Sequence, residues 1–254
     1  MISNFFHTVF YNPIYNALVA IVALTPGANV GVAVILVTIL IRILLLPFSL
    51  SASRTQRTMK VLEPKIKALK EKHKGNKEQE ALETLALYRE ARVNPFASVL
   101  TMFIQIPVLL ALYWVFRSNP FTALETSRLY VFTPIPAHAS LYFLGISLAG
   151  KSAIFAVIAG MTQYAQAHFA LSGVPQSSSS GSGSMQGDFQ KVMSMQLKYV
   201  FPFLIAVICY TTSAAVALYF VTSNIFGSLQ EWHIRRTHGN NRTPEGAIEP
   251  VSAP

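Results

Sequence analysis

The chain has 254 residues, 52% of them hydrophobic and only 12% charged, whereas soluble domains carry about 25% charged residues. This composition excludes an ordinary soluble domain and indicates an integral membrane protein. The net charge of +9 does not predict a nucleic-acid partner, because eleven of the 20 Lys and Arg fall in residues 51–95 beside six Glu, a mixture typical of solvated helices.

The first 29 residues predict a helix at the membrane surface, followed by a turn. Residues 5–24 are apolar and aromatic, but His7, Asn12, Pro13 and Asn16 interrupt them, and the uninterrupted remainder is too short to span a bilayer. We therefore expect an N-terminal interfacial helix, with an additional spanning helix as the alternative. No Lys or Arg precedes this segment, so a cleaved secretory signal is not expected.

Residues 30–50 are long and apolar enough for a first transmembrane helix, and Arg42 lies well inside it. A guanidinium at that depth costs roughly 3 kcal/mol on insertion scales, so such a residue normally faces water, a partner or a substrate. Thr38, Arg42 and Ser49 share one helical face. The alternative is that Arg42 extends to the cytoplasmic headgroups and has only an anchoring role.

Residues 51–95 predict an antiparallel helical hairpin outside the membrane. Pro64 is expected to break or kink its first helix, and a turn is expected near Gly75. Apolar residues recur at steps of three and four in each half, which predicts two narrow packing seams. These residues are Met59, Leu62, Ile66 and Leu69 in the first half and Leu82, Leu85 and Tyr88 in the second.

The remaining chain predicts four further spans, which makes an all-α integral membrane protein with five transmembrane helices. The spans are residues 96–116, 152–171, 195–212 and 213–232, separated by an extracytoplasmic loop (117–151) and a flexible cytoplasmic linker (172–194) and followed by a tail (233–254). Gln105, Gln163 and Gln166 lie inside spans, and together with Thr38 and Arg42 they would line a wet cavity. Alternatively, these glutamines only bond between helices.

The distribution of positive charge predicts the orientation. Sixteen Lys and Arg fall in the hairpin, in residues 172–198 and in the tail, against three on the opposite side. Cytoplasmic loops carry the excess of Lys and Arg, so the hairpin and the C-terminus are expected in the cytoplasm and the N-terminus outside.

Signs of catalysis are weak. Residues 145–152, GISLAGKS, match the phosphate-loop pattern, but an apolar span follows them and no acidic magnesium partner is in view. The six His show no metal-ligand spacing. We expect no cofactor, no metal and no enzymatic activity.

Three ordered strings resemble the YidC/Oxa/Alb family of membrane protein insertases. They are NVGVAVILVTILIRILLLPFS, LEPKIKALKEKHKGNKEQEALETLALYREARVNPF and IQIPVLLALYWVF, and LYFVTSNIFGSLQEW ends the last predicted span. The resemblance, to a compact bacterial member, implies a five-helix core around a hydrophilic groove that opens to cytoplasm and lipid, with Arg42 inside it. Phe220 stands where many bacterial relatives have Trp, which adds it to the expected groove residues.

The resemblance also implies a function and partners. Family members insert and fold nascent membrane proteins in the lipid bilayer, alone or beside the Sec translocon, without hydrolysing nucleotide. We therefore expect an insertase of the bacterial plasma membrane, with the Sec translocon and the ribosome as further candidate partners and no specific nucleic acid. The alternatives are an assembly factor without autonomous insertase activity and, less favoured, a small channel or transporter.

Overall fold

A computed structural model describes residues 2–73, 75–91, 97–117, 121, 124–171 and 195–238. Most of these residues are helical, as expected. The predicted linker over residues 172–194 and the end of the predicted tail, residues 239–254, lie outside the described residues. The elements in chain order are α1 (Ile2–Phe6), a π-helical segment (His7–Tyr11), α2 (Asn12–Leu24), a short turn (Pro26–Ala28), α3 (Val30–Leu44), α4 (Leu46–Lys72), α5 (Lys77–Glu90), α6 (Ala97–Arg117), a 3₁₀ turn (Thr126–Arg128), β1 (Tyr142–Phe143), β2 (Ile146–Ser147), α7 (Ala153–Leu171), a second π-helical segment (Gln196–Val200), α9 (Phe201–Thr211) and α10 (Ala214–His238).

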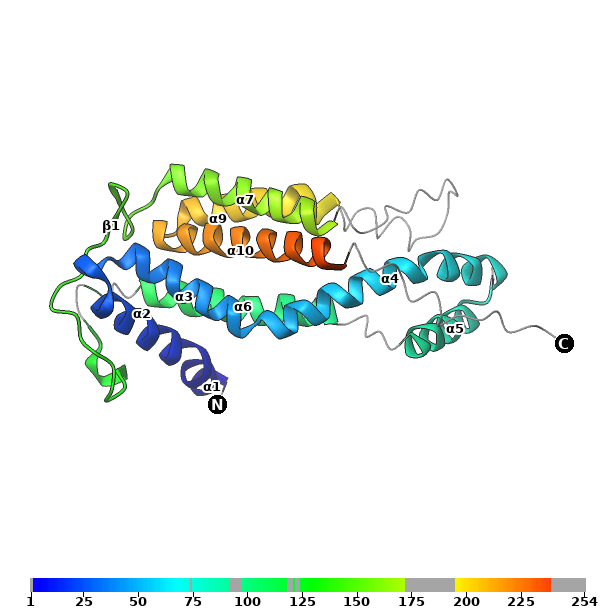
Figure 1. Cartoon of the computed structure of the whole chain (residues 1–254), viewed down its shortest axis with the longest axis horizontal. Helices are drawn as coiled ribbons and strands as arrows, with labels where there is room; N and C mark the ends of the chain where they lie inside the picture. Colours follow the sequence, from blue (N-terminus) through cyan, green and yellow to red (C-terminus); the bar gives the residue numbers. More distant parts are fainter. Residues whose placement is uncertain are drawn as a thin grey trace.

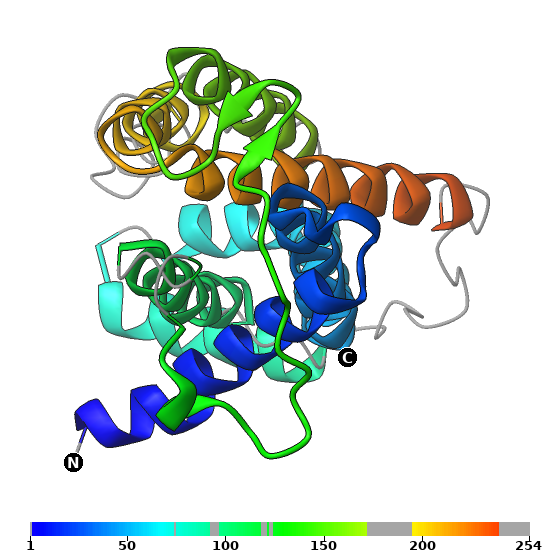
Figure 2. The same cartoon turned by 90° about the vertical axis from the view of Figure 1, so that its left-hand side faces the viewer.

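The helices form a bundle with one projecting arm. α7, α9 and α10 lie side by side along the long axis, and α3 packs against α10 from the other side (Figure 1). α2 crosses α3 obliquely, and α4 and α5 extend beyond the end of the bundle. Viewed from the opposite end, the loop between α6 and α7 passes over the bundle and along its edge (Figure 2).

The chain bends between α3 and α4, inside the segment predicted as one span. Val30–Leu44 and Leu46–Ser53 meet at 57°, and Pro47 lies in the first turn of α4. A proline lacks an N–H donor and its ring clashes with the carbonyl four residues earlier, here that of Ile43. A straight helix through residue 50 is therefore disfavoured, and the bend falls just after Arg42.

The projecting arm keeps part of the predicted hairpin. α4 continues through Pro64 without a break; this proline is exposed, where water can bond the freed Lys60 carbonyl. Leu62 is 7% exposed, as its seam predicts, but Leu82 and Leu85 are 61% and 43% exposed. The prediction that Leu82 and Leu85 pack in a second seam is therefore wrong.

Polar contacts join the two helices of the arm near their turn. The His73 Nε2 atom lies 2.9 Å from the Glu83 carboxylate, although the pair lacks the alignment of a hydrogen bond. Burial raises the pKa of the Tyr88 phenol above its ordinary value, so this phenol stays protonated and neutral at neutral pH.

At the opposite end of the bundle, one loop caps two helices. The Asn29 side chain accepts a hydrogen bond from the Val32 N–H and so caps α3, and the Val30 N–H donates to the Ser140 carbonyl. The Ala214 N–H, at the start of α10, donates to the Gly150 carbonyl at 2.7 Å. These bonds satisfy N–H groups that a helix start leaves without partners. The phosphate-loop-like segment thus contributes a carbonyl to a helix cap.

Gly31 allows β1 to pack closely on α3. A Cβ atom at this position would lie 2.4–2.6 Å from three atoms of Phe143, including its own Cβ. Gly31→Ala is expected to destabilise the protein by about 1–3 kcal/mol, the usual cost of overpacking, as a lower denaturation midpoint in detergent. Gly150→Ala is the control, since its new Cβ would meet only one atom, at 3.9 Å. An unchanged midpoint for Gly31→Ala would show that Phe143 moves aside freely.

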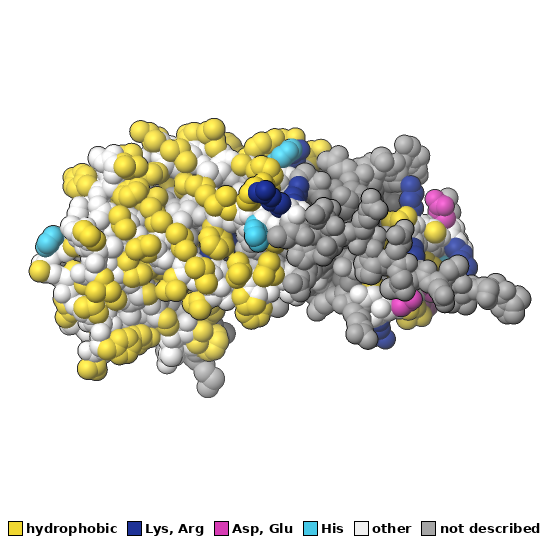
Figure 3. Space-filling view, in the orientation of Figure 1, with side chains coloured by type: hydrophobic (Ala, Val, Ile, Leu, Met, Phe, Trp, Pro, Cys, Tyr) yellow, Lys and Arg dark blue, Asp and Glu magenta, His cyan; other side chains and the backbone are white. Residues whose placement is uncertain are grey.

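The bundle surface is strongly apolar. On the face drawn in Figure 3, hydrophobic side chains cover most of the bundle, and charged side chains gather toward the arm. Exposed members include Ile154 and Met161 on α7 and Phe203 on α9. By length and composition, and among described residues only, Asn4–Leu24 could cross a membrane, and the bent pair Val30–Leu44 with Leu46–Ser53 could form a second crossing. Ile106–Arg117 and Lys198–Thr211 are shorter apolar helices.

Candidate functional site

Arg42 lies in the last turn of α3 and reaches toward α10. Its Nε atom donates a hydrogen bond to the Ser223 hydroxyl at 2.9 Å, and its Nη2 atom donates to the same oxygen. Ser223 is 1% exposed and the arginine is half-buried. The guanidinium is therefore fixed at the boundary between α3 and α10, by a contact between residues that are 181 positions apart in the chain.

No carboxylate among the described residues pairs with Arg42. A guanidinium has five N–H donors, and the two bonds to Ser223 leave three of them for water or another acceptor. A hydroxyl satisfies hydrogen bonds without neutralising charge, so the site can attract an anionic group.

A second polar contact continues the same seam. The Gln230 Nε2 atom donates to the Ser49 hydroxyl at 2.6 Å. Ser49 lies on α4, beyond the bend, and follows Arg42 by seven residues; Gln230 follows Ser223 by seven, which is two turns of α10. The predicted face of Arg42 and Ser49 does point at one neighbour, namely α10. The sequence alone does not predict Ser223 and Gln230 as the partners. The signal that could have found them is the seven-residue spacing of two polar residues in an apolar segment, which matches the spacing of Arg42 and Ser49.

Thr38 lies one turn before Arg42, but it is closed off. Its side chain is 1% exposed, and its hydroxyl donates to the Val34 carbonyl of its own helix at 2.6 Å. This local bond uses the only hydroxyl proton, a pattern common for Thr in helices.

Of the two glutamines on α7, Gln166 makes its own contact with α10, one turn beyond Ser223. Gln166 packs on Gly227, where an added Cβ would come within 2.4 Å of its amide nitrogen, and Gln163 is half-buried. Near them, the buried Asn224 amide donates to the Thr162 hydroxyl at 3.2 Å. Among the described contacts, none joins Arg42 to either glutamine.

The two other expected groove residues are placed only in part. Phe220 is buried, one turn before Ser223, with its ring edge-on to Tyr219 at 5.4 Å between centroids. Gln105 belongs to α6, but its side chain lies outside the described part of the chain.

No metal site is found in the described part of the chain. The described residues contain no group of three or more His, Cys, Asp or Glu able to hold an ion. Cys209, the single cysteine, is buried.

Comparison with known proteins assigns the family. The model of the family described as "60Kd inner membrane protein" matches residues 21–241. The chain is 28% identical over 208 residues to the membrane protein insertase YidC of Fusobacterium nucleatum, covering 82% of this chain and 87% of that protein. It is 28% identical to the membrane protein insertase MisCB of Bacillus subtilis, covering 98% and 86%. It is 31% identical to MisCA of the same organism, covering 86% and 75%. The protein therefore belongs to the 60Kd inner membrane protein family, the family of YidC, Oxa and Alb.

Proposed function

We propose that this protein is a membrane protein insertase of the bacterial plasma membrane, and that Arg42 receives polar or acidic flanks of its substrates. Relatives of similar length carry the name membrane protein insertase. The observation that carries the role of Arg42 is its pairing with a hydroxyl rather than a carboxylate. A charge held in this way has free capacity for an incoming anion.

The proposed architecture has five membrane spans, formed by α3, α6, α7, α9 and α10, around a hydrophilic groove that opens to cytoplasm and lipid. Its lining would comprise Arg42, Gln105, Gln163 and Gln166. The predicted groove residues Thr38 and Phe220, like Ser223, are buried and would support this lining from within the bundle. The arm formed by α4 and α5 would be cytoplasmic, and α1 and α2 would form the interfacial helix. The predominance of apolar side chains on the bundle and of charge toward the arm (Figure 3) supports this orientation.

The proposed mechanism needs no covalent chemistry. A nascent segment enters from the cytoplasm, and its polar flank rests near Arg42 and water instead of hydrocarbon, where each unsatisfied polar group costs several kcal/mol. The apolar part then moves into lipid along the groove wall. Burial of apolar surface, roughly 25 cal/mol per Å², drives this step. No nucleotide is consumed, and the Sec translocon and the ribosome are candidate partners rather than requirements.

Reconstitution tests the function directly. Liposomes that contain only this protein are expected to insert a short single-span substrate, so that its membrane segment becomes protected from protease, while empty liposomes do not. Insertion only after other factors are added would identify an assembly factor instead. Ion flux through the protein without substrate would identify a channel.

The proposed topology makes a separate prediction. Single cysteines at positions 75 and 180 should react with impermeant reagents only from the cytoplasm, and one at position 125 only from outside. A cysteine at position 4 should react from outside if α1–α2 is interfacial; cytoplasmic reaction there would make it a sixth span. Outside labelling at position 245 would show that residues 195–232 cross only once.

A further inference from the structure

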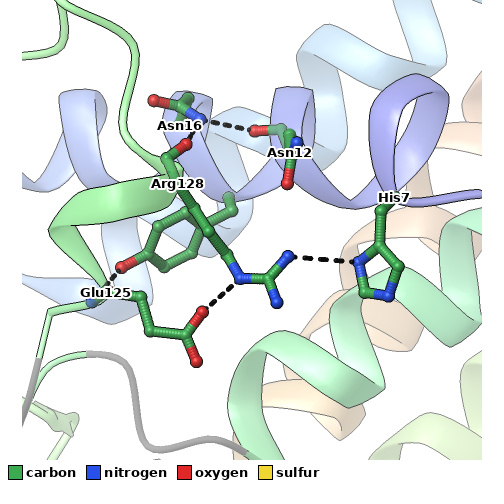
Figure 4. Close-up of polar contacts among 6 residues, drawn as sticks. His7, Asn12, Asn16, Glu125 and Arg128 are labelled. Atoms are coloured by element: carbon green, nitrogen blue, oxygen red, sulfur yellow. Dashed lines mark hydrogen bonds and ion pairs between the residues drawn. The ribbon is translucent and has the colours of Figure 1, made fainter. Parts of the chain in front are cut away.

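The loop between α6 and α7 is tied to α2 through one buried amide. Asn16 is 4% exposed, and its Oδ1 atom accepts bonds from the Tyr130 N–H and the Thr133 hydroxyl, both at 2.7 Å. Its Nδ2 atom donates to the carbonyls of Asn12 and Arg128, at 2.8 and 2.9 Å (Figure 4). An Asn side chain offers two donors and one acceptor oxygen with two lone pairs, so every capacity of this group is used. The loop is thereby held in one position.

The charges at the base of this loop pair with one another and with the N-terminal helical segment. The Arg128 guanidinium pairs with the Glu125 carboxylate and lies 3.4 Å from the His7 Nδ1 atom (Figure 4). It also stands 5.3 Å from the centre of the Tyr11 ring. The Glu125 N–H donates to the Tyr15 hydroxyl at 3.0 Å. These polar groups therefore contact the π-helical segment His7–Tyr11 and α2, and the tip of the loop carries apolar side chains.

The tip is a tight turn with unusual corner residues. The Thr133 N–H donates to the Tyr130 carbonyl at 2.9 Å, which places Val131 and Phe132 at the two corners. Corners of such turns normally carry Gly, Pro, Asn, Asp or Ser. Here the corner side chains are fully and 83% exposed, and Ile135 is 59% exposed.

The composition around the turn suits an environment poor in water. Residues 129–137, LYVFTPIPA, contain no charged side chain. Pro134 and Pro136 have no N–H group, so two of the backbone donors that would otherwise need partners are missing. The turn bond and Asn16 satisfy the Thr133 and Tyr130 N–H groups. Few polar groups would thus have to be desolvated if the tip entered an apolar phase.

The position of the loop indicates which apolar phase is available. It lies at the end of the molecule where α3 and α10 begin, on the outer edge beside α2 (Figures 1 and 2). Leu24, at the end of α2, is among the exposed apolar residues of the helices. Under the proposed topology this is the level of the outer headgroups, where aromatic side chains accumulate.

We propose that the turn Tyr130–Thr133 dips into the outer leaflet of the bilayer, with Val131 and Phe132 among the lipid chains. The partner is a lipid surface rather than a protein. The turn would anchor α2 and the loop at a fixed depth while leaving the cytoplasmic side of the bundle free. The inference rests on the proposed orientation in the membrane, although it does not depend on insertase activity.

Depth measurement by spin labelling tests the proposal. Cys209→Ala removes the single native cysteine, and Phe132→Cys then carries a nitroxide in protein reconstituted into phosphatidylcholine and phosphatidylglycerol vesicles. We expect the label to collide more with oxygen, which concentrates in lipid, than with a water-soluble nickel chelate. Ser127→Cys in the same background is the matched control, because Ser127 is an exposed polar residue of the same anchored loop; its label should prefer the nickel chelate.

Two results would overturn the proposal. A label at position 132 that is as accessible to nickel as the control would place the tip in water. A label protected from both reagents would indicate a protein contact, such as a second copy of the chain. Neither accessibility measurement uses substrate, so a failed insertion assay would not change the depth found for either label.

Discussion

Arg42→Ala is expected to reduce the insertion of substrates with acidic flanks by about tenfold to a hundredfold. At an effective dielectric near 20, two unit charges 4 Å apart attract by about 4 kcal/mol, and desolvation removes part of this gain. A net value of about 1.5–3 kcal/mol, typical of hydrogen bonds to charged groups, corresponds to that loss, since 1.4 kcal/mol is tenfold. The measurement is protease-protected substrate per unit time in proteoliposomes.

Variants that keep or reverse the charge separate electrostatics from structure. Arg42→Lys should retain much of the activity, while Arg42→Glu should reject acidic flanks and tolerate basic ones better. Arg117→Ala is the matched control: it also removes one guanidinium, but from an exposed position. There the contacts among described residues are with Tyr113 and Trp114 of its own helix. Equal losses of Arg42→Ala activity for acidic, neutral and basic flanks would contradict the electrostatic account.

Ser223 provides a finer test of the same site. Ser223→Ala removes the hydroxyl that fixes the guanidinium but leaves the charge in place. We expect a smaller loss than for Arg42→Ala and a retained preference for acidic flanks. A loss as large as that of Arg42→Ala would mean that the orientation of the guanidinium, rather than its charge, controls insertion.

The sequence predicts Arg42 as a functional residue, but it does not predict Ser223 as its partner. The depth of a charged residue in an apolar run is a local property that one segment reveals. The contact with Ser223 depends on how α3 and α10 pack, and these helices come together only in the folded chain. The packing of Gln166 on Gly227 also depends on how α7 and α10 meet. The burial of Thr38 likewise depends on packing.

The sequence predicts the N-terminal segment as helical, which the structure confirms, but it does not predict what the polar interruptions bind. Asn16 does interrupt an apolar run, and the structure uses it to bond a loop more than 110 residues away. A fully satisfied buried amide is compatible with an apolar helix face, because its hydrogen bonds replace those to water. No pattern within residues 5–24 contains this information, since the partners belong to the loop.

Leu62→Asp is expected to unfold the arm formed by α4 and α5 while the bundle stays in the membrane. Leu62 is 7% exposed, and losing such a side chain alone costs about 2–5 kcal/mol; a buried carboxylate adds a further desolvation cost. Limited proteolysis should cut the variant within residues 51–91 at protease concentrations that leave the wild type intact. If the arm recruits substrate from the cytoplasm, insertion should fall in parallel.

Leu82→Asp is the matched control for this variant. It introduces the same charge into the same arm, but its leucine is 61% exposed, and exposed substitutions usually change stability by no more than about 0.5 kcal/mol. Protease resistance and insertion should therefore stay close to the wild-type values. Equal sensitivity of both variants would mean that charge, not loss of the Leu62 contact, loosens the arm. Full insertion by a Leu62→Asp protein with a protease-sensitive arm would show that recruitment does not require a folded arm, and substrate would then reach Arg42 directly from the cytoplasm.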